Sequence, residues 1–150
     1  MIWWLSFLYM QAHVFEGGGL RIMSQDIVVS TGGLGTPSTS SLLARQLGES
    51  AVRELASRGV QAELRVVELR DYANDITSNL LTGHAPQRLA QVIETVADAA
   101  GLVVVSPVFT ASVSGLFKTF IDILDPALLE DKPMVLAATG GSPRHSMVID

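Results

Sequence analysis

The sequence contains no cysteine, which excludes disulfide frameworks, thiolate zinc sites, iron–sulfur clusters and cysteine nucleophiles. Charged residues are also scarce, at 17% of the 150 residues, whereas hydrophobic residues reach 48%. This balance excludes intrinsic disorder as the main state and predicts one compact domain with a hydrophobic core. The absence of cysteine agrees with a cytoplasmic location, which we expect for this protein.

Basic residues are outnumbered, with ten Lys and Arg against fifteen Asp and Glu, so the net charge is -5. A surface of this charge repels nucleic acid and anionic membranes, and we expect neither as a partner. An anionic ligand would therefore have to be held by a local arrangement of hydrogen-bond donors.

Residues 1–23 differ from the rest of the chain. Their apolar run, residues 2–10, is shorter than the roughly 20 residues that cross a bilayer. A secretory signal would begin with basic residues, but the first one here is Arg21. We interpret residues 1–23 as a disordered, non-native or mis-assigned leader before a domain over residues 24–150, with Met23 as a plausible alternative start. A signal or membrane anchor is the competing interpretation.

The domain alternates between strand and helix patterns. We predict strands at residues 27–29, 64–69, 102–105 and 134–138, and helices at residues 40–58, 89–100 and 115–124. Residues 102–105 are apolar throughout, as in a strand that helices cover on both faces, which predicts a parallel sheet. Residues 72–85 have no such pattern, and we expect them to form an irregular excursion that overhangs the functional site.

Three of the predicted strands end in polar or glycine-rich loops. Because right-handed crossovers place the carboxyl ends of parallel strands at one edge, these loops should converge on one crevice, the predicted site. The first loop, residues 31–41, combines glycines and hydroxyl side chains before a helix, where free amides and the helix dipole favour an anion. It is neither a Walker A loop nor a G-x-G-x-x-G loop, and it suits a single terminal phosphate ester. The alternative is a helix N-cap with a glycine turn.

The other two loops suit a planar ring. Residues 106–115 mix a proline, one aromatic and small side chains, which predicts a flat wall with accessible backbone amides. Residues 139–145 add Arg144 and His145, although a solvated Arg–His pair is the alternative. We find no nucleophilic triad and no metal-ligating pattern, and we assign no catalytic residue, because hydride transfer through a cofactor needs none from the protein.

Taken together, these segments resemble the NAD(P)H-dependent FMN reductases, which have a flavodoxin-like fold and supply reduced flavin to two-component monooxygenases. The resemblance covers residues 27–150 and rests on residues 32–44, 107–122 and 138–145. It implies an α/β three-layer sandwich with a parallel sheet, FMN and NADPH or NADH as cofactors, and a homodimer or homotetramer with a flavin-dependent monooxygenase as partner. The residues that it assigns to FMN are Gly33, Ser38, Thr39 and Ser40 for the phosphate, Pro107, Val108, Phe109, Thr110 and Ser112 for the ring, and Thr139, Gly140, Gly141 and Ser142 for the edge of the ring.

Two departures from the family pattern affect the site. Gly35 stands where many relatives carry an arginine near the phosphate, which leaves charge neutralisation to the helix dipole or another chain, and Val113 stands where many carry an aromatic. With only four clear strands before Asp150, we expect a C-terminally truncated domain that lacks the last helix and strand. Three alternatives stay open: a flavodoxin-type electron-transfer protein, an NAD(P)H-dependent quinone or azo-dye reductase, and a folded but inactive remnant.

Overall fold

The computed structural model describes residues 25–141. Its strands are β1 (Ile27–Thr31), β2 (Leu64–Glu68), β3 (Gly101–Phe109), β4 (Ser112–Val113) and β5 (Met134–Thr139). Its helices are α1 (Thr39–Ser57), α2 (Ala73–Thr82), α3 (Gln87–Asp98) and α4 (Gly115–Asp122), with short 3₁₀ turns η2 (Leu69–Tyr72) and η3 (Pro126–Leu128). The leader interpretation concerns residues outside the described part of the chain.

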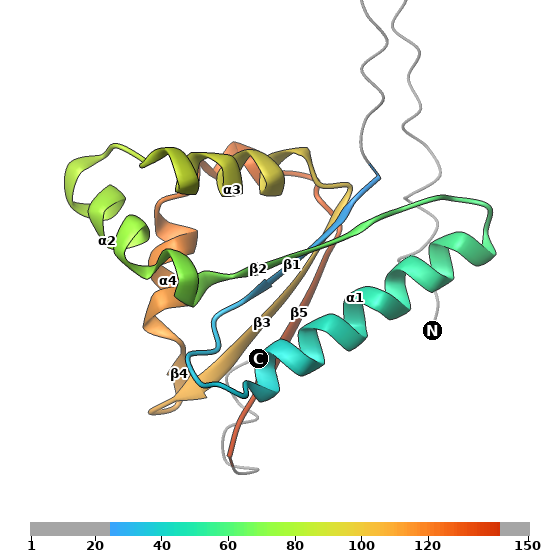
Figure 1. The fold of residues 1–150 in the computed structure, drawn as a ribbon, viewed down its shortest axis with the longest axis horizontal. Helices are drawn as coiled ribbons and strands as arrows, with labels where there is room; N and C mark the ends of the chain where they lie inside the picture. The colour runs from blue at the N-terminus through green and yellow to red at the C-terminus, as the bar shows by residue number, and fades with distance from the viewer. Residues whose placement is uncertain (1–24, 142–150) are drawn as a thin grey trace, which may run out of the picture.

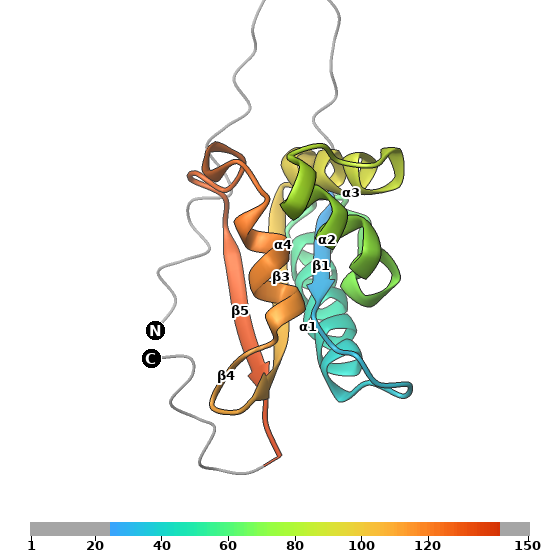
Figure 2. The ribbon, with the colours of Figure 1, turned by 90° about the vertical axis from the view of Figure 1, so that its left-hand side faces the viewer.

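The strands form one sheet in the order β2-β1-β3-β5, and all neighbours in this order are parallel. β4 pairs antiparallel with the end of β3. Figures 1 and 2 show α1 on one face of the sheet and α2, α3 and α4 on the other, which gives three layers. This order and layering are those of the flavodoxin-like α/β fold, as the sequence predicted.

The two faces of the sheet form separate cores because successive side chains of a strand point in opposite directions. Val28 of β1 packs with Leu89 and Phe120 in the core beneath α2, α3 and α4. The next residue, Val29, packs with Ala44 and Leu55 of α1 in the second core. Because β1, β3 and β5 pair in parallel, their carboxyl ends lie side by side at one edge of the sheet.

Residues 72–85 correct one sequence expectation, because most of them form α2 rather than an irregular excursion. Ile76 is fully buried on the inner side of this helix, and Gly83 ends it with a positive φ of 70°. The tertiary burial of Ile76 supplies the stabilisation that the mostly polar segment lacks by itself. β3 is also longer than expected, since residues 106–109 continue it into a hairpin with β4, a short strand that was not predicted.

Candidate functional site

The loops that follow β1, β3 and β5 are tied together by hydrogen bonds. The Gly32 amide, just after β1, donates to the Val105 carbonyl of β3 at 3.0 Å. The hydroxyl groups of Ser40 in α1 and Thr139 in β5 lie 2.6 Å apart, although the two residues are 99 positions apart in the sequence. The structure therefore brings the three predicted loops together at one edge of the sheet.

The first loop ends in a capped helix start. The Ser38 hydroxyl accepts a hydrogen bond from the Ser41 amide at 3.2 Å, as an N-cap does. The amides of Thr39 and Ser40, at the first two helical positions, have no partner within the helix, and the first turn of α1 contains no acidic residue. The positive end of the helix dipole and these amides therefore favour an anion here.

Gly33 allows the cradle formed by residues 32–40 to close. A Cβ at this position would lie 2.2 Å from the Ser38 Oγ and 3.4 Å from the Ser40 Cβ. Within the cradle Thr39 is exposed and Ser38 half-buried, whereas the Ser40 hydroxyl is buried and engaged with Thr139. Of the three predicted phosphate-binding hydroxyls, Thr39 is thus the most accessible.

The second loop is a tight hairpin, formed by the end of β3 and by β4. Pro107 and Val108 are buried within β3. Phe109 is 47% exposed and pairs with Ser112 of β4. Thr110 and the next residue, Ala111, form the turn between these strands with φ of 50° and 57°, in the left-handed region. Neither is glycine, so the tip stores backbone strain, which is a common feature of ligand-binding loops.

The third loop begins at Thr139, which is half-buried, and continues through the exposed Gly140 and Gly141. The predicted contribution of Ser142, and those of Arg144 and His145, lie outside the described residues.

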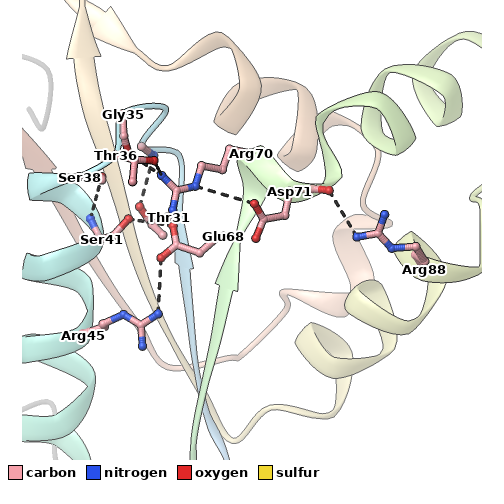
Figure 3. Close-up of polar contacts among 11 residues, drawn as sticks. Thr31, Gly35, Thr36, Ser38, Ser41, Arg45, Glu68, Arg70, Asp71 and Arg88 are labelled. Atoms are coloured by element: carbon pink, nitrogen blue, oxygen red, sulfur yellow. Dashed lines mark hydrogen bonds and ion pairs between the residues drawn. The ribbon is translucent and has the colours of Figure 1, made fainter.

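Sequence reasoning missed the end of β2, which contributes charged side chains to the first loop (Figure 3). The Glu68 carboxylate accepts a hydrogen bond from the Ser41 hydroxyl at 2.8 Å and lies 3.6 Å from Arg45. The Arg70 guanidinium donates to the Gly35 carbonyl and, at 2.9 Å, to the Thr36 hydroxyl. The only signal in the sequence was the charged pair Arg70 and Asp71, which directly follows the predicted strand at residues 64–69.

Two serine hydroxyls near this edge of the sheet are buried without a hydrogen-bond partner among the described residues, those of Ser30 and Ser114. Ser114 is the N-cap residue of α4 and lies close to Gly32, where an added Cβ would be 3.5 Å from the Ser114 Oγ. In residues 25–141 no group of His, Asp and Glu side chains could hold a metal ion. Among the same residues, no helix combines the length and hydropathy that a bilayer crossing needs.

Comparison with known proteins identifies the family. The model of the NADPH-dependent FMN reductase family matches residues 26–150. The chain belongs to this family. The FMN reductase (NADPH) of Pseudomonas aeruginosa is 36% identical over 124 residues, and the NADH-dependent FMN reductase SfnE of Pseudomonas putida is 34% identical over 125 residues. In both comparisons the match covers 83% of this chain and 64% of the relative, so the chain spans just under two thirds of these curated relatives.

Solved structures agree with this membership. An oxidoreductase from Corynebacterium diphtheriae superposes with a TM-score of 0.82 at 35% identity, covering 85% of this chain and 70% of that one. The apo form of the NADH:FMN oxidoreductase EMOB superposes with a TM-score of 0.70 at 31% identity, covering 85% and 64%. The family resemblance and the flavodoxin-like fold predicted from the sequence are therefore confirmed.

The donor set at the sheet edge suits a flavin mononucleotide. The α1 cradle offers neutral amides and hydroxyls to a phosphate, and Gly33 provides the space that a side chain would fill. The hairpin places the half-exposed Phe109 and the backbone of residues 110–112 at the same edge, where a planar ring could lie. Both halves of the ligand thus find suitable groups on neighbouring elements.

Proposed function

We propose that the protein is an NAD(P)H-dependent FMN reductase that transfers hydride from NADPH or NADH to FMN and provides the reduced flavin to a partner oxygenase. The observation that carries the proposal is the capped, glycine-lined start of α1 lying beside the β3–β4 hairpin, in a chain of this family. An electron-carrying flavodoxin is less favoured, because the hairpin offers the single aromatic Phe109.

The proposal assigns the parts of FMN to separate elements. Amides and hydroxyls at the α1 cradle hold the phosphate, the hairpin flanks the ring, and the end of β5 lines its edge. The residues in these roles are Gly33, Ser38, Thr39 and Ser40 for the phosphate, Pro107, Val108, Phe109, Thr110 and Ser112 for the ring, and Thr139, Gly140, Gly141 and Ser142 for the edge of the ring.

The chain's own contribution to the reaction is binding and orientation. FMN, when bound, supplies the ring that accepts hydride, so no acid, base or nucleophile is required of the protein. The hairpin backbone and Phe109 orient one side of the ring, and the α1 cradle fixes the phosphate at the other end. A ligand held at both ends approaches its reaction partner in a defined geometry, which lowers the entropic cost of the reaction.

We also propose a cytoplasmic location and a homodimeric or homotetrameric assembly. NAD(P)H and FMN are cytoplasmic metabolites, and the cysteine-free sequence suits a reducing compartment. Equilibrium sedimentation of the full chain would test the assembly.

Rapid mixing of the FMN-loaded protein with NADPH or NADH, without oxygen, tests the function. We expect fast loss of the visible flavin absorbance with at least one nicotinamide, and transfer of the reduced flavin to an added flavin-dependent oxygenase. Ser38→Ala should weaken FMN binding, whereas Ser57→Ala, an exposed serine at the other end of α1, should leave it unchanged. Tight FMN binding without bleaching would contradict the reductase and favour an electron carrier. Faster reoxidation of the reduced flavin by a quinone or an azo dye than by the oxygenase would favour a quinone or azo-dye reductase.

A further inference from the structure

The α1 cradle lacks a positive side chain of its own. Residues 31–41 include no Lys or Arg. A phosphate monoester has a charge of about -1.5 to -2 at pH 7, because its second pKa is about 6. A protein of net charge -5 must offset this charge locally, and a helix end contributes only about half an elementary charge.

Arg70 brings a cation to the cradle from the 3₁₀ turn that follows the neighbouring strand. β2 and β1 are parallel, with Glu68 opposite Thr31, so the residues that follow these two strands lie side by side. Arg70, in η2, extends across this gap, and its Nη1 donates to the Gly35 carbonyl and the Thr36 hydroxyl (Figure 3). The side chain is 28% exposed, so it is enclosed enough to be ordered while part of it still faces solvent.

We propose that Arg70 binds the phosphate of FMN and supplies the positive charge that the cradle loop lacks. This inference rests on the proposed function, because it assigns a further residue to the same FMN site. A guanidinium suits the role: it is always charged, carries five N–H donors in a planar fork, and binds phosphate oxygens in pairs.

The neighbouring carboxylates leave this role open to Arg70. Asp71 lies 3.8 Å from the Arg70 Nε, but the Asp71 side chain is 62% exposed. Water and salt therefore screen this ion pair, and it neutralises little of the Arg70 charge. Glu68 lies closer to the helix start, and its carboxylate is already held by the Ser41 hydroxyl and by Arg45. Arg45 is thereby committed to Glu68, which leaves Arg70 as the cation that contacts the cradle loop within residues 25–141.

Binding of FMN and riboflavin to matched variants tests the proposal, because riboflavin lacks only the phosphate. Arg70→Gln removes the charge but keeps an amide donor, and we expect about 10- to 100-fold weaker FMN binding, as for a lost hydrogen bond to a charged group. Riboflavin binding should stay unchanged, and Arg70→Lys should recover part of the loss. Arg53→Gln is the matched control: the Arg53 side chain is 69% exposed and contacts Glu49 and Ser50 within α1.

The pH dependence separates charge recognition from loop positioning. Between pH 5 and pH 8 the FMN phosphate passes from mainly singly to mainly doubly charged, since its second pKa is about 6. The wild-type protein should gain affinity over this range, and Arg70→Gln should gain less. An equal loss for FMN and riboflavin, or a loss that is the same at both pH values, would overturn the proposal and make Arg70 a structural part of the loop.

Two further outcomes are distinct. If Arg70→Gln raises the KM for NADPH but not for NADH, while FMN affinity is unchanged, Arg70 contacts the nicotinamide nucleotide and the proposal is wrong. If the wild-type protein binds neither flavin, the proposed function itself fails. If the wild-type protein binds FMN and Arg70→Gln binds it equally well, the function stands and only the role of Arg70 is refuted.

Discussion

Replacing Gly33 by alanine should destabilise the protein through the cap of α1 rather than through Gly33 itself. The new Cβ would lie 2.2 Å from the Ser38 Oγ, a distance that real Cβ atoms do not reach. The clash is relieved at the lowest energy by rotation of the Ser38 side chain, which removes the hydrogen bond that the Ser38 hydroxyl accepts from the Ser41 amide. Loss of an N-cap costs about 1 kcal/mol, within a range of about 0.5–2 kcal/mol.

This mechanism predicts a coupling between two substitutions. Ser38→Ala alone should cost about 1 kcal/mol in the free energy of unfolding, because it removes the same cap. In the Ser38→Ala background, Gly33→Ala should then cost only a few tenths of a kcal/mol, since the remaining contacts, 3.3 Å to the Ser38 Cβ and 3.4 Å to the Ser40 Cβ, are tight but tolerable.

Urea unfolding of the FMN-free protein, followed by far-ultraviolet circular dichroism, measures the four variants of this cycle. In a separate thermal unfolding experiment, Gly33→Ala should lower the Tm by about 3–5 °C. Gly115→Ala is the matched control, because an added Cβ there meets nothing within 4 Å and should not destabilise the fold. Additive costs of Gly33→Ala and Ser38→Ala would refute the shared mechanism, and so would a loss no larger than that of the control.

Three other predictions concern stability. Gly48→Ala should destabilise the protein by about 1 kcal/mol, because its Cβ would lie 2.5 Å from Leu64 Cδ1 and overpacking outweighs the gain in helix propensity; unchanged urea unfolding would contradict this. Ala111→Gly should raise the Tm, since it relieves a left-handed φ of 57° worth about 1 kcal/mol, and a lower Tm would speak against strain at this turn. Burial lowers the pKa of Lys132 in the folded protein, so at pH values approaching 10.5 the unfolded state binds more protons than the folded state. The unfolding free energy of the wild type should therefore increase over that range relative to Lys132→Met, and an equal pH dependence of the two proteins would show that the lysine does not contribute.

The central part of the fold was predictable because its strands and helices carry strong patterns. The β-branched run of β3 and the four-residue repeat of α1 each indicate one kind of element, and the structure has a strand and a helix over these residues, although β3 extends further than predicted. α2 escaped prediction because only Ile76 is buried among its apolar residues, while Leu80 and Leu81 stay exposed. A helix whose buried residues are only Ile76 and the polar Asn79 shows little hydrophobic periodicity.

The site was predictable where it depends on chain order and not where it depends on side-chain reach. Convergence of the β1, β3 and β5 loops follows from parallel pairing, so the sequence sufficed. The bond between Ser40 and Thr139, and the reach of Arg70 to Gly35, depend on which side chains span the gaps between elements. The β3–β4 hairpin was missed because Thr110 and Ala111 are unusual residues for a turn with two positive φ angles.

The contacts of the two halves of the site imply an unequal division of binding energy. The cradle is held from three sides: by the Ser38 cap, by Thr139 through Ser40, and by Arg70 from η2. A loop fixed in this way loses little entropy when a phosphate binds, so most of the interaction energy is available for affinity. On the ring side, β4 is instead a strand of two residues that follows a strained turn, and part of the energy of ring contacts must go into ordering it. Affinity for the flavin should therefore come mainly from the phosphate end, with the ring end left free to exchange contacts as reduced FMN leaves.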